Sequence, residues 1–382
     1  MTKEVGDVSI LFIGSALVVC IGLLSGMVVF WRVPSLRTTQ PPTFQLASTV
    51  TIIIPARNEE QRIQPLLESI ALQEGVRIET IVVDDHSTDC TREVAQSFGV
   101  RVLTNETLED GWIGKSAACW TGANAADSDL LLFIDADTVF SSPTSLLAYL
   151  SEYEEMGGIG ILSLQPDHKA ERWYEQLASI FPVVVMMGMN VFTVVGDAVK
   201  SAGSFGPCVL CRKDEYGAVG GHESVRGAVM DDLALGKKFQ EKQLPVRCYS
   251  GRGIAWLRMY PGGFRQLIQG YSKSMASGSL ATHPLVMLLI NAWIVGGVLS
   301  PLLLLLFAAF SGEVGFLLVA GTLVICYMAS VARAIRKAGN FSFWTVPLYP
   351  VLFLFFIGVF MYSLYLAKWR KRVRWSGRDI QV

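Results

Sequence analysis

The chain carries long apolar runs at its two ends and shorter apolar segments, separated by polar turns, in its middle. One uninterrupted run covers Ser9–Trp31. It is long enough to cross a bilayer core of roughly 30 Å at about 1.5 Å per residue. Three further runs lie near the C-terminus, over Pro284–Phe310, Val314–Ala332 and Phe341–Ala367. The pattern predicts membrane helices on both sides of one folded domain.

A cleaved signal peptide is the alternative for the first run. Signal peptides have a basic start and a shorter apolar stretch, whereas here Lys3 is accompanied by Glu4 and Asp7. We therefore predict a retained anchor over residues 1–37. Arg32 and Arg37 follow the apolar run directly, and basic residues beside a membrane segment favour the cytoplasmic side. We expect the next domain, residues 38–283, to be cytoplasmic.

The C-terminal runs give a contradictory topology. Basic residues flank the last run on both sides: Arg333, Arg336 and Lys337 before it, and Lys368, Arg370, Lys371, Arg372 and Arg374 after it. Both clusters favour the cytoplasm, yet a single crossing between them would put them on opposite sides. Pro347 and Pro350 interrupt the run, so it either re-enters the membrane or begins as a helix at the membrane surface. We predict a membrane region over residues 284–367 and a basic cytoplasmic tail over 368–382.

Composition agrees with partial burial in lipid. Hydrophobic residues make up 51% of the chain, charged residues only 17%, and mean hydropathy is +0.41, which is unusual for a wholly soluble protein. The net charge of −1 gives no electrostatic reason to propose a nucleic-acid partner. The seven cysteines are scattered, and the single pair Cys208 and Cys211 lacks the partners that a zinc site needs, so we interpret them as packing thiols.

The middle of the chain reads as an α/β domain. The predicted elements are a strand from Thr49 that ends at Pro55, a helix capped by Asn58, strands over Glu79–Val83 and Val100–Leu103, a helix over Lys115–Ala126, and a strand over Leu130–Ile134. Strands that alternate with helices predict right-handed crossovers and a mostly parallel open sheet. Ligands of such sheets bind at the carboxyl ends of the strands.

Acidic residues stand at two of those strand ends. Asp135 and Asp137 follow a buried strand, where both carboxylates can reach a divalent cation that grips a diphosphate. A simple turn is the alternative, and the position after the strand favours the metal. Asp84 and Asp85 end another strand, where a carboxylate can accept hydrogen bonds from a ribose or a uracil-type base. The polar residues 87–89 beside them can equally cap the next helix.

Further polar groups are candidates for phosphate binding and for base catalysis. Gly114 and Lys115 stand at the start of a predicted helix, where the backbone N–H groups and the lysine ammonium can bind a phosphate. The spacing of the motif is not that of a P-loop ATPase. Arg57 is a second phosphate candidate, although a solvated face is the alternative for each. Asp231 and Asp232 precede an apolar helix, either as helix N-terminal acids or as a general base.

In this order, the motifs resemble family 2 glycosyltransferases of GT-A fold over residues 49–275. Within the family the likeness is to the enzymes of staphyloxanthin-type carotenoid synthesis, which act on the carotenoid acid 4,4'-diaponeurosporenoate. Four local strings carry it: residues 114–120, 162–166, 188–192 and 375–378. The resemblance implies a UDP-sugar donor, with glucose as the sugar, a divalent metal (Mg2+ or Mn2+) and an inverting mechanism. It implies Asp85 at the nucleotide, Asp135 and Asp137 at the metal and diphosphate, and Asp231 or Asp232 as the base.

The predicted site combines these assignments. On the nucleotide-sugar side it comprises Pro55, Arg57, Glu59, Asp85, Lys115, Asp135 and Lys273, and on the acceptor side Gly206, Gly221 and His222, for which a structural histidine is an equal interpretation. One departure stands out. Polymerising relatives have a Gln-x-x-Arg-Trp motif, which residues 269–274 lack, so we expect transfer of a single sugar and place Lys273 as the substitute cation.

The acceptor is expected to be lipophilic. A carotenoid acid is the first choice, and ceramide, a hopanoid or polyprenyl phosphate is the alternative. The apolar segment Trp173–Val195 is interpreted either as a membrane-facing surface through which the acceptor enters or as a buried core helix. A catalytically inactive scaffold is a third hypothesis, against which the intact acids argue.

Overall fold

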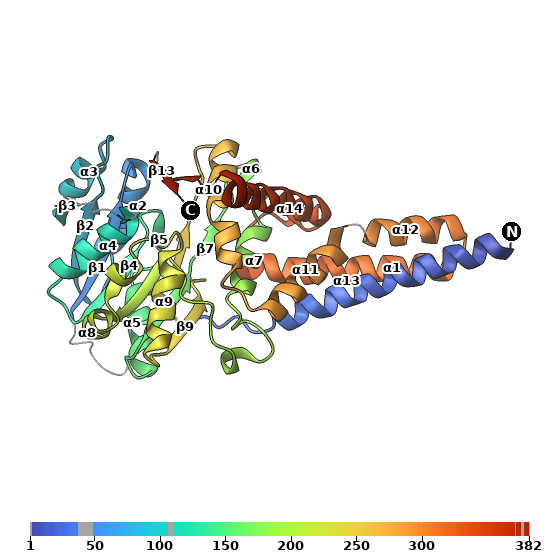
Figure 1. Ribbon diagram of the computed structural model, residues 1–382, viewed down its shortest axis with the longest axis horizontal. Coiled ribbons are helices and arrows are strands. Elements are labelled where there is room, and N and C mark those ends of the chain that lie inside the picture. The colour runs from blue at the N-terminus through green and yellow to red at the C-terminus, as the bar shows by residue number, and fades with distance from the viewer. Residues whose placement is uncertain are drawn as a thin grey trace.

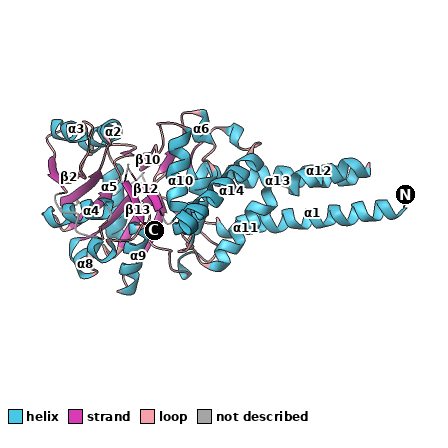
Figure 2. Cartoon of the chain, turned by 45° about the horizontal axis from the view of Figure 1, so that its top comes forward, coloured by secondary structure: helices cyan, strands magenta, loops and turns pink. Residues whose placement is uncertain are grey.

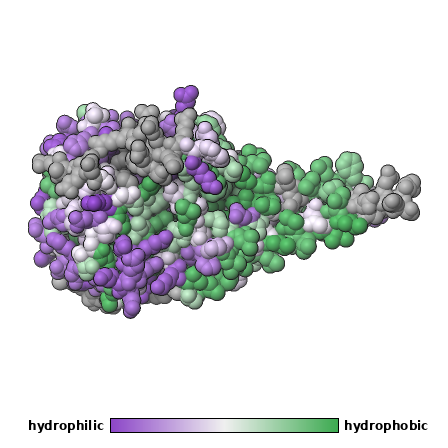
Figure 3. Space-filling model, viewed as in Figure 1, coloured by the Kyte–Doolittle hydropathy of each residue, from purple (hydrophilic) through white to green (hydrophobic). Residues whose placement is uncertain are grey.

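A globular α/β domain and a bundle of long helices lie at opposite ends of the molecule (Figure 1). The computed structural model describes residues 2–36, 49–105, 111–112, 114–298, 300–370, 372–375 and 378–381. The N-terminus lies at the far end of the bundle. The strands gather at the domain end (Figure 2). Hydrophilic residues cover much of the domain, whereas hydrophobic residues dominate the surface of the bundle (Figure 3).

The domain is built on a seven-stranded sheet of order β3-β2-β1-β4-β8-β6-β9. The strands are β1 (Thr49–Ala56), β2 (Arg77–Asp84), β3 (Arg101–Thr104), β4 (Leu130–Ile134), β6 (Ile161–Gln165), β8 (Cys208–Arg212) and β9 (Val246–Ser250). The first four are parallel, and β8 runs antiparallel to both β4 and β6. The predicted mostly parallel sheet is confirmed. The carboxyl ends of β1, β2 and β4 therefore meet at one edge.

The helices of the domain are α2 (Glu60–Ala71), α3 (Thr91–Ser97), α4 (Gly114–Ala125), α5 (Ser145–Glu155), α6 (Trp173–Gln176), α7 (Ile180–Gly188), α8 (Lys213–Ala218), α9 (Asp231–Glu241) and α10 (Phe264–Ser279), with short 3-10 turns at Gly196–Ala198 and Gly221–Val225. Helices cover both faces of the sheet, so the apolar residues of β1 are fully buried. Ile52 packs on one face in the same core cluster as Leu66 of α2, and Ile53 packs on the other face with Ala118 of α4.

Two local predictions around β1 are wrong. The strand does not end at Pro55 but continues to Ala56. Asn58 does not cap α2, because Glu59 occupies the N-cap position. Asn58 instead has a positive φ of 56°, and its Oδ1 accepts hydrogen bonds from the backbone N–H and the hydroxyl of Thr88. The side chain thus joins the loops that follow β1 and β2 rather than starting a helix.

A second sheet connects the domain to the membrane helices. Its order is β11-β7-β10-β5, with β5 (Thr138–Phe140), β7 (Asp167–Lys169), β10 (Ala255–Leu257) and β11 (Gly339–Asn340). Strand β5 begins directly after Asp137, and β11 directly follows α13. The sheet therefore joins the predicted metal site to the end of a membrane helix through backbone hydrogen bonds.

The apolar runs form α1 (Thr2–Val29), α11 (Pro284–Val298), α12 (Ser300–Ser311), α13 (Val314–Ala338) and α14 (Tyr349–Tyr365), followed by Leu366–Arg370, β12 (Arg372–Trp375) and β13 (Arg378–Gln381). Within the described ranges, three helices are long and apolar enough to span a membrane: Ser9–Val29, Val314–Ala338 and Tyr349–Trp369. Helices α11 and α12 are bent by 40° and together make a fourth candidate. Membrane association follows from these helices. Gly22 and Gly296 let α1 and α11 approach closely, since a Cβ on Gly22 would lie 3.0 Å from the Cα of Gly296.

Helix α14 lies between the two basic clusters that give the contradictory topology. Before it, β11 pairs with β7 in the domain; at its start, Tyr349 stacks on Tyr327 of α13, about three turns from that helix's end. Near its end, the Ser363 hydroxyl accepts the Ala276 N–H of α10. The chain thus leaves the domain, packs beside α13 and returns to the domain. Re-entry and a helix at the membrane surface both stay predictions for this run. Of the charged residues used for sidedness, Arg37 and Lys371 lie outside the described residues.

The segment Trp173–Val195 is core through its middle. Phe181 is fully buried and stacks on Tyr271 of α10 at 4.1 Å and edge-on to Phe356 of α14 at 5.0 Å. Only the ends are exposed, with Trp173 at 74% and Val195 at 54%. The interpretation as an entry surface is therefore wrong for α7, which packs between the domain and the membrane helices.

Buried His168 of β7 should make the stability of the protein depend on pH. Burial lowers the pKa of His168 to about 4, while its usual value is 6.5. Between those values the unfolded chain takes up a proton that the folded chain excludes, so stability falls as pH falls through this window. At about 1.4 kcal/mol per pKa unit the effect is at most about 3 kcal/mol.

We expect the unfolding temperature of His168→Gln to fall less than that of the wild type when the pH is lowered from 7 to 4.5. Tryptophan fluorescence of the protein in nanodiscs measures the unfolding temperature. His86→Asn is the matched control, because His86 is exposed and has a positive φ of 56° that asparagine tolerates. Equal slopes in wild type and His168→Gln would contradict this assignment.

Candidate functional site

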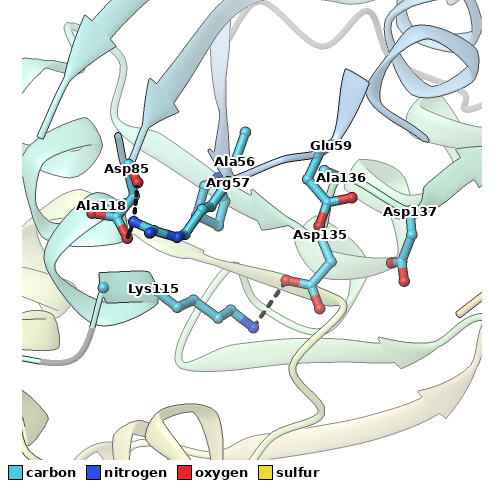
Figure 4. A pocket seen from close by; sticks show the side chains of 11 residues that line it. Ala56, Arg57, Glu59, Asp85, Lys115, Ala118, Asp135, Ala136 and Asp137 are labelled. Carbon is cyan, nitrogen blue, oxygen red and sulfur yellow. Dashed lines mark hydrogen bonds and ion pairs between the residues drawn. The ribbon is translucent and has the colours of Figure 1, made fainter. Parts of the chain in front are cut away.

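A pocket lies at the carboxyl edge of the parallel strands, where the sequence predicts a ligand site. Its walls come from the ends of β1, β2 and β4 and the start of α4 (Figure 4). The lining residues are Pro55, Ala56, Arg57, Glu59, Asp85, Gly114, Lys115, Ala118, Asp135, Ala136 and Asp137. All six predicted nucleotide-sugar residues other than Lys273 are among them.

Asp85 is held in place at one end of the pocket. It is 1% exposed, and Arg57 donates from Nη1 to its backbone oxygen at 2.7 Å and lies 3.5 Å from Oδ2. Asn105 donates to Oδ1 at 3.2 Å. Sequence reasoning missed Asn105, which follows β3 just as Asp85 follows β2. Asp84 has a different role: its Oδ1 accepts the Ser87 N–H at 3.1 Å and so shapes the loop.

Lys115 joins two parts of the site. From the first turn of α4 its Nζ lies 2.9 Å from Oδ1 of Asp135 and 3.1 Å from Oδ2 of Asp232. Burial alone would lower the pKa of Lys115, but the two carboxylates raise it well above its usual value. The residue is therefore a permanent cation between a strand end and the start of α9.

Asp137 belongs to a second charged group. Its Oδ2 lies 3.8 Å from Nη1 of Arg62, whose Nε lies 2.6 Å from Oε2 of Glu59. Burial raises the pKa of Asp137 to about 6 and that of Glu59 to about 8; Asp135 adds to the first shift, and Arg62 partly opposes both. Sequence reasoning missed Arg62, although its position one helical turn after Glu59 is a recognisable signal.

The pair Asp135 and Asp137 fits a divalent cation. Both carboxylates reach into the pocket (Figure 4). Burial raises the pKa of each, because a carboxylate held away from water is less stable in its charged form. A hard cation prefers oxygen ligands and keeps positions for substrate oxygens. Two protein carboxylates would leave those positions to a diphosphate and water.

Asp231 and Asp232 are the first two residues of α9. Asp231 accepts a hydrogen bond from the Ser116 hydroxyl at 3.2 Å, whereas Asp232 contacts Lys115. Burial first, and then the neighbouring Asp231, raise the pKa of Asp232. Both acids stand at a helix N-terminus, and Asp232 also contacts the pocket cation, so the role of general base stays a prediction.

Gly206 is required for this arrangement. A Cβ there would lie 2.2 Å from Oδ2 of Asp232 and 3.4 Å from Nζ of Lys115. Real carbon atoms do not approach an oxygen so closely, so any side chain would displace the carboxylate. The structure thus brings Gly206 to the two charged groups, and its place on the acceptor side stays a prediction.

His222 is buried beside the same acids. Its ring Nδ1 is 2.9 Å from the hydroxyl of Tyr216, which also accepts the His222 backbone N–H at 3.0 Å. Burial lowers the pKa of His222 to about 4, so the ring is neutral near pH 7. Gly221 has a positive φ of 49°, and a Cβ there would lie 2.5 Å from the Tyr216 ring. The lack of a side chain at Gly221 therefore leaves room for the Tyr216 ring, which holds His222 in place.

Lys273 projects from α10 toward the same region. Burial first, and then the neighbouring Lys115, lower the pKa of Lys273 to about 8, while Asp231, Asp135 and Asp232 oppose the shift. The predicted cation therefore lies near these three acids.

Three comparisons bear on this site. Residues 51–214 match the family model Glycosyl transferase family 2. The chain is 37% identical over 335 residues to a 4,4'-diaponeurosporenoate glycosyltransferase of Staphylococcus aureus (strain MRSA252), covering 87% of this chain and 88% of that protein. It is 34% identical over 372 residues to the enzyme of the same name from Staphylococcus haemolyticus, covering 95% and 96%.

Among solved structures, the chain is similar to the mannosyltransferase PcManGT from Pyrobaculum calidifontis in complex with GDP-Man and Mn2+. The TM-score is 0.54 at 15% sequence identity, and the match covers 94% of this chain and 99% of that one. This likeness confirms the GT-A-like α/β fold with its mostly parallel sheet.

Proposed function

Since the chain belongs to glycosyltransferase family 2, we propose that it transfers one sugar from a nucleotide-diphospho-sugar to a carotenoid acid at a membrane surface. The relatives named for 4,4'-diaponeurosporenoate support this acceptor, because their similarity includes the membrane helices as well as the domain. The membrane helices support a lipophilic acceptor on their own. We propose the cytoplasm as the side of the domain, on the charge pattern of the sequence.

One observation carries the proposal: a single ammonium, that of Lys115, bridges Asp135 and Asp232 at 2.9 and 3.1 Å. A donor diphosphate bound at Asp135 would then lie next to the carboxylate that faces the acceptor. Such closeness is what direct transfer between two bound substrates needs.

UDP-glucose is the proposed donor. Asp85, fixed by Arg57 and Asn105, presents a carboxylate suited to the ribose and base of a nucleotide. Asp135 and Asp137 would hold Mg2+ or Mn2+, and the ion when bound supplies positive charge to the diphosphate. The solved relative that contains GDP-Man and Mn2+ supports a nucleotide-sugar and a metal in this fold. Lys115 and Lys273 add positive charge where the leaving diphosphate gains negative charge.

The proposed reaction is a one-step displacement with inversion. An acceptor oxygen attacks the anomeric carbon, the bond from that carbon to the diphosphate breaks, and the nucleoside diphosphate leaves with the bonding electron pair. Asp232 is favoured as the base over Asp231, which is engaged by Ser116. A carboxylic acid acceptor, with a pKa of about 4 to 5, is already ionised at neutral pH and needs no strong base.

The acceptor is tested by assaying the full chain in nanodiscs with labelled UDP-glucose and a panel of lipids. We expect label in the organic extract with 4,4'-diaponeurosporenoate and little with ceramide, a hopanoid or polyprenyl phosphate. Efficient labelling of one of the other lipids instead would replace the carotenoid acid as the acceptor.

Loss of a metal-binding carboxylate should abolish turnover of the donor. We expect Asp135→Ala and Asp137→Ala to reduce Mn2+-dependent hydrolysis of UDP-glucose by at least about 100-fold, because the diphosphate loses its counter-ion. UDP release is the measurement. Asp214→Ala is the control, since that carboxylate is 76% exposed and outside the pocket. Wild-type hydrolysis in both pocket variants would refute the metal assignment.

Removal of the base should affect acid and alcohol acceptors differently. We expect Asp232→Asn to lower kcat with a carotenoid acid by about tenfold or less, because the nucleophile is already ionised. With the matching carotenoid alcohol the loss should reach about 100-fold or more. A complete loss with the acid acceptor would show that Asp232 does more than accept a proton.

Gly206→Ala should impair transfer without affecting folding. The new methyl group would displace the Asp232 carboxylate and approach Lys115, so we expect kcat to fall by about tenfold or more. Gly217→Ala is the matched control, because a Cβ at that helical position meets no atom within 4 Å. Equal kcat values for the two variants would mean that the close approach at Gly206 is dispensable.

A further inference from the structure

His222, Asp231 and Asp232 bring one nitrogen and two carboxylates together, with the ligand atoms within 4.8 Å of one another. We propose that this trio is a second divalent-cation site, separate from the pair Asp135 and Asp137, and that it takes a borderline cation such as Mn2+ or Zn2+. The inference does not depend on the identity of the sugar or the acceptor. An ion held by Asp232 would have to leave before that carboxylate could accept a proton from an alcohol acceptor.

The spacing fits a shared ion better than a direct hydrogen bond. His222 is 1% exposed, and its Nε2 has no hydrogen-bond partner among the described residues. Because Nδ1 is engaged by Tyr216, Nε2 is the ring nitrogen left to bind an ion, and a ring nitrogen of His222 lies within 4.8 Å of an oxygen of each carboxylate. Ligand atoms that lie about 2.0 to 2.2 Å from one ion are about 3 to 4.2 Å apart. Shifts of a few tenths of an ångström would complete such a site.

The ring of His222 is oriented as a metal ligand would be. Tyr216 holds Nδ1 at 2.9 Å, and its hydroxyl is itself fixed by the His222 backbone N–H. When Nδ1–H donates to the Tyr216 oxygen, the lone pair of Nε2 faces the two carboxylates. Metal-binding histidines commonly have the other ring nitrogen engaged in this way. The neutral ring needs to lose no proton before it binds.

The local charge also favours a cation. Three carboxylates, those of Asp135, Asp231 and Asp232, face two lysines, Lys115 and Lys273. Buried charge without full compensation is unfavourable, and a divalent ion would neutralise the excess. A nitrogen ligand disfavours Mg2+, which prefers oxygen, and suits Mn2+ or Zn2+.

Lys115 separates this trio from the first metal pair. Its ammonium lies between Asp135 and Asp232, so one ion is not expected to reach both groups while Lys115 remains there. The two sites should therefore be occupied independently.

The test uses the untagged full chain in nanodiscs, with Mn2+ as the probe and inorganic diphosphate in place of a nucleotide, which would add its own nitrogen. Electron spin echo envelope modulation reports 14N next to Mn2+ for a histidine ligand and 31P for diphosphate. We expect two Mn2+ per chain, one with imidazole 14N coupling. Asp137→Asn should remove one ion and keep that coupling, whereas His222→Gln should remove the coupling.

The chain has four histidines, so the source of a nitrogen signal can be assigned. His86→Asn, at an exposed position, is the control and should leave the coupling unchanged. One Mn2+ per chain in the wild type, a single ion coupled to both 31P and 14N, or 14N coupling that survives His222→Gln would each overturn the second site. Stoichiometry and the Asp137→Asn variant decide the matter even if His222→Gln does not fold.

Discussion

The ammonium group of Lys115 lies between two carboxylates from distant parts of the chain, Asp135 at 2.9 Å and Asp232 at 3.1 Å. Without a cation at this point the acids at the end of β4 and at the start of α9 would repel each other in a buried setting. Much of the site depends on this contact. Gly206 leaves room for the Asp232 carboxylate, and Ser116, one residue after Lys115, engages Asp231.

The same site is coupled to the membrane part by packing. Helix α10 carries Lys273 toward the acids, and through Tyr271 it stacks on Phe181, which also packs on α14. Strand β11, which follows α13, pairs with β7 in the second sheet. The same sheet contains β5, which begins directly after Asp137. A catalytic edge attached to membrane helices in this way suits a water-soluble donor and a lipid-soluble acceptor.

The parallel strands and their acidic ends could be predicted from sequence, because buried β-branched runs and the residues after them form a local pattern. Asp85 and Asp135 directly follow such strands and line the pocket for that reason. Asn105 and Arg62 occupy recognisable positions, but their contacts with Asp85 and Asp137 could not be predicted, since these arise only when neighbouring loops fold together. Asn58 shows the reverse error: a good capping residue is used to join two loops because Glu59 begins the helix.

For segments of uniform hydrophobicity, the sequence could not tell whether the segment faces lipid or the protein core, or which path it follows. Nothing in the composition of 173–195 separates a lipid-facing surface from a core, and only the packing of Phe181 decides it. The last apolar run was undetermined because Pro347 and Pro350 allow several paths, and the contacts of Tyr349 and Ser363 select the one that returns to the domain.

The central claim is a direct displacement between a donor at Asp135 and an acceptor beside Asp232. The configuration of the anomeric carbon in the product tests it most directly. NMR of the sugar ester formed from UDP-glucose and a carotenoid acid should show a β-linked product, inverted relative to the α-linked donor. An α-linked product would mean that the sugar is transferred with retention and would contradict this account.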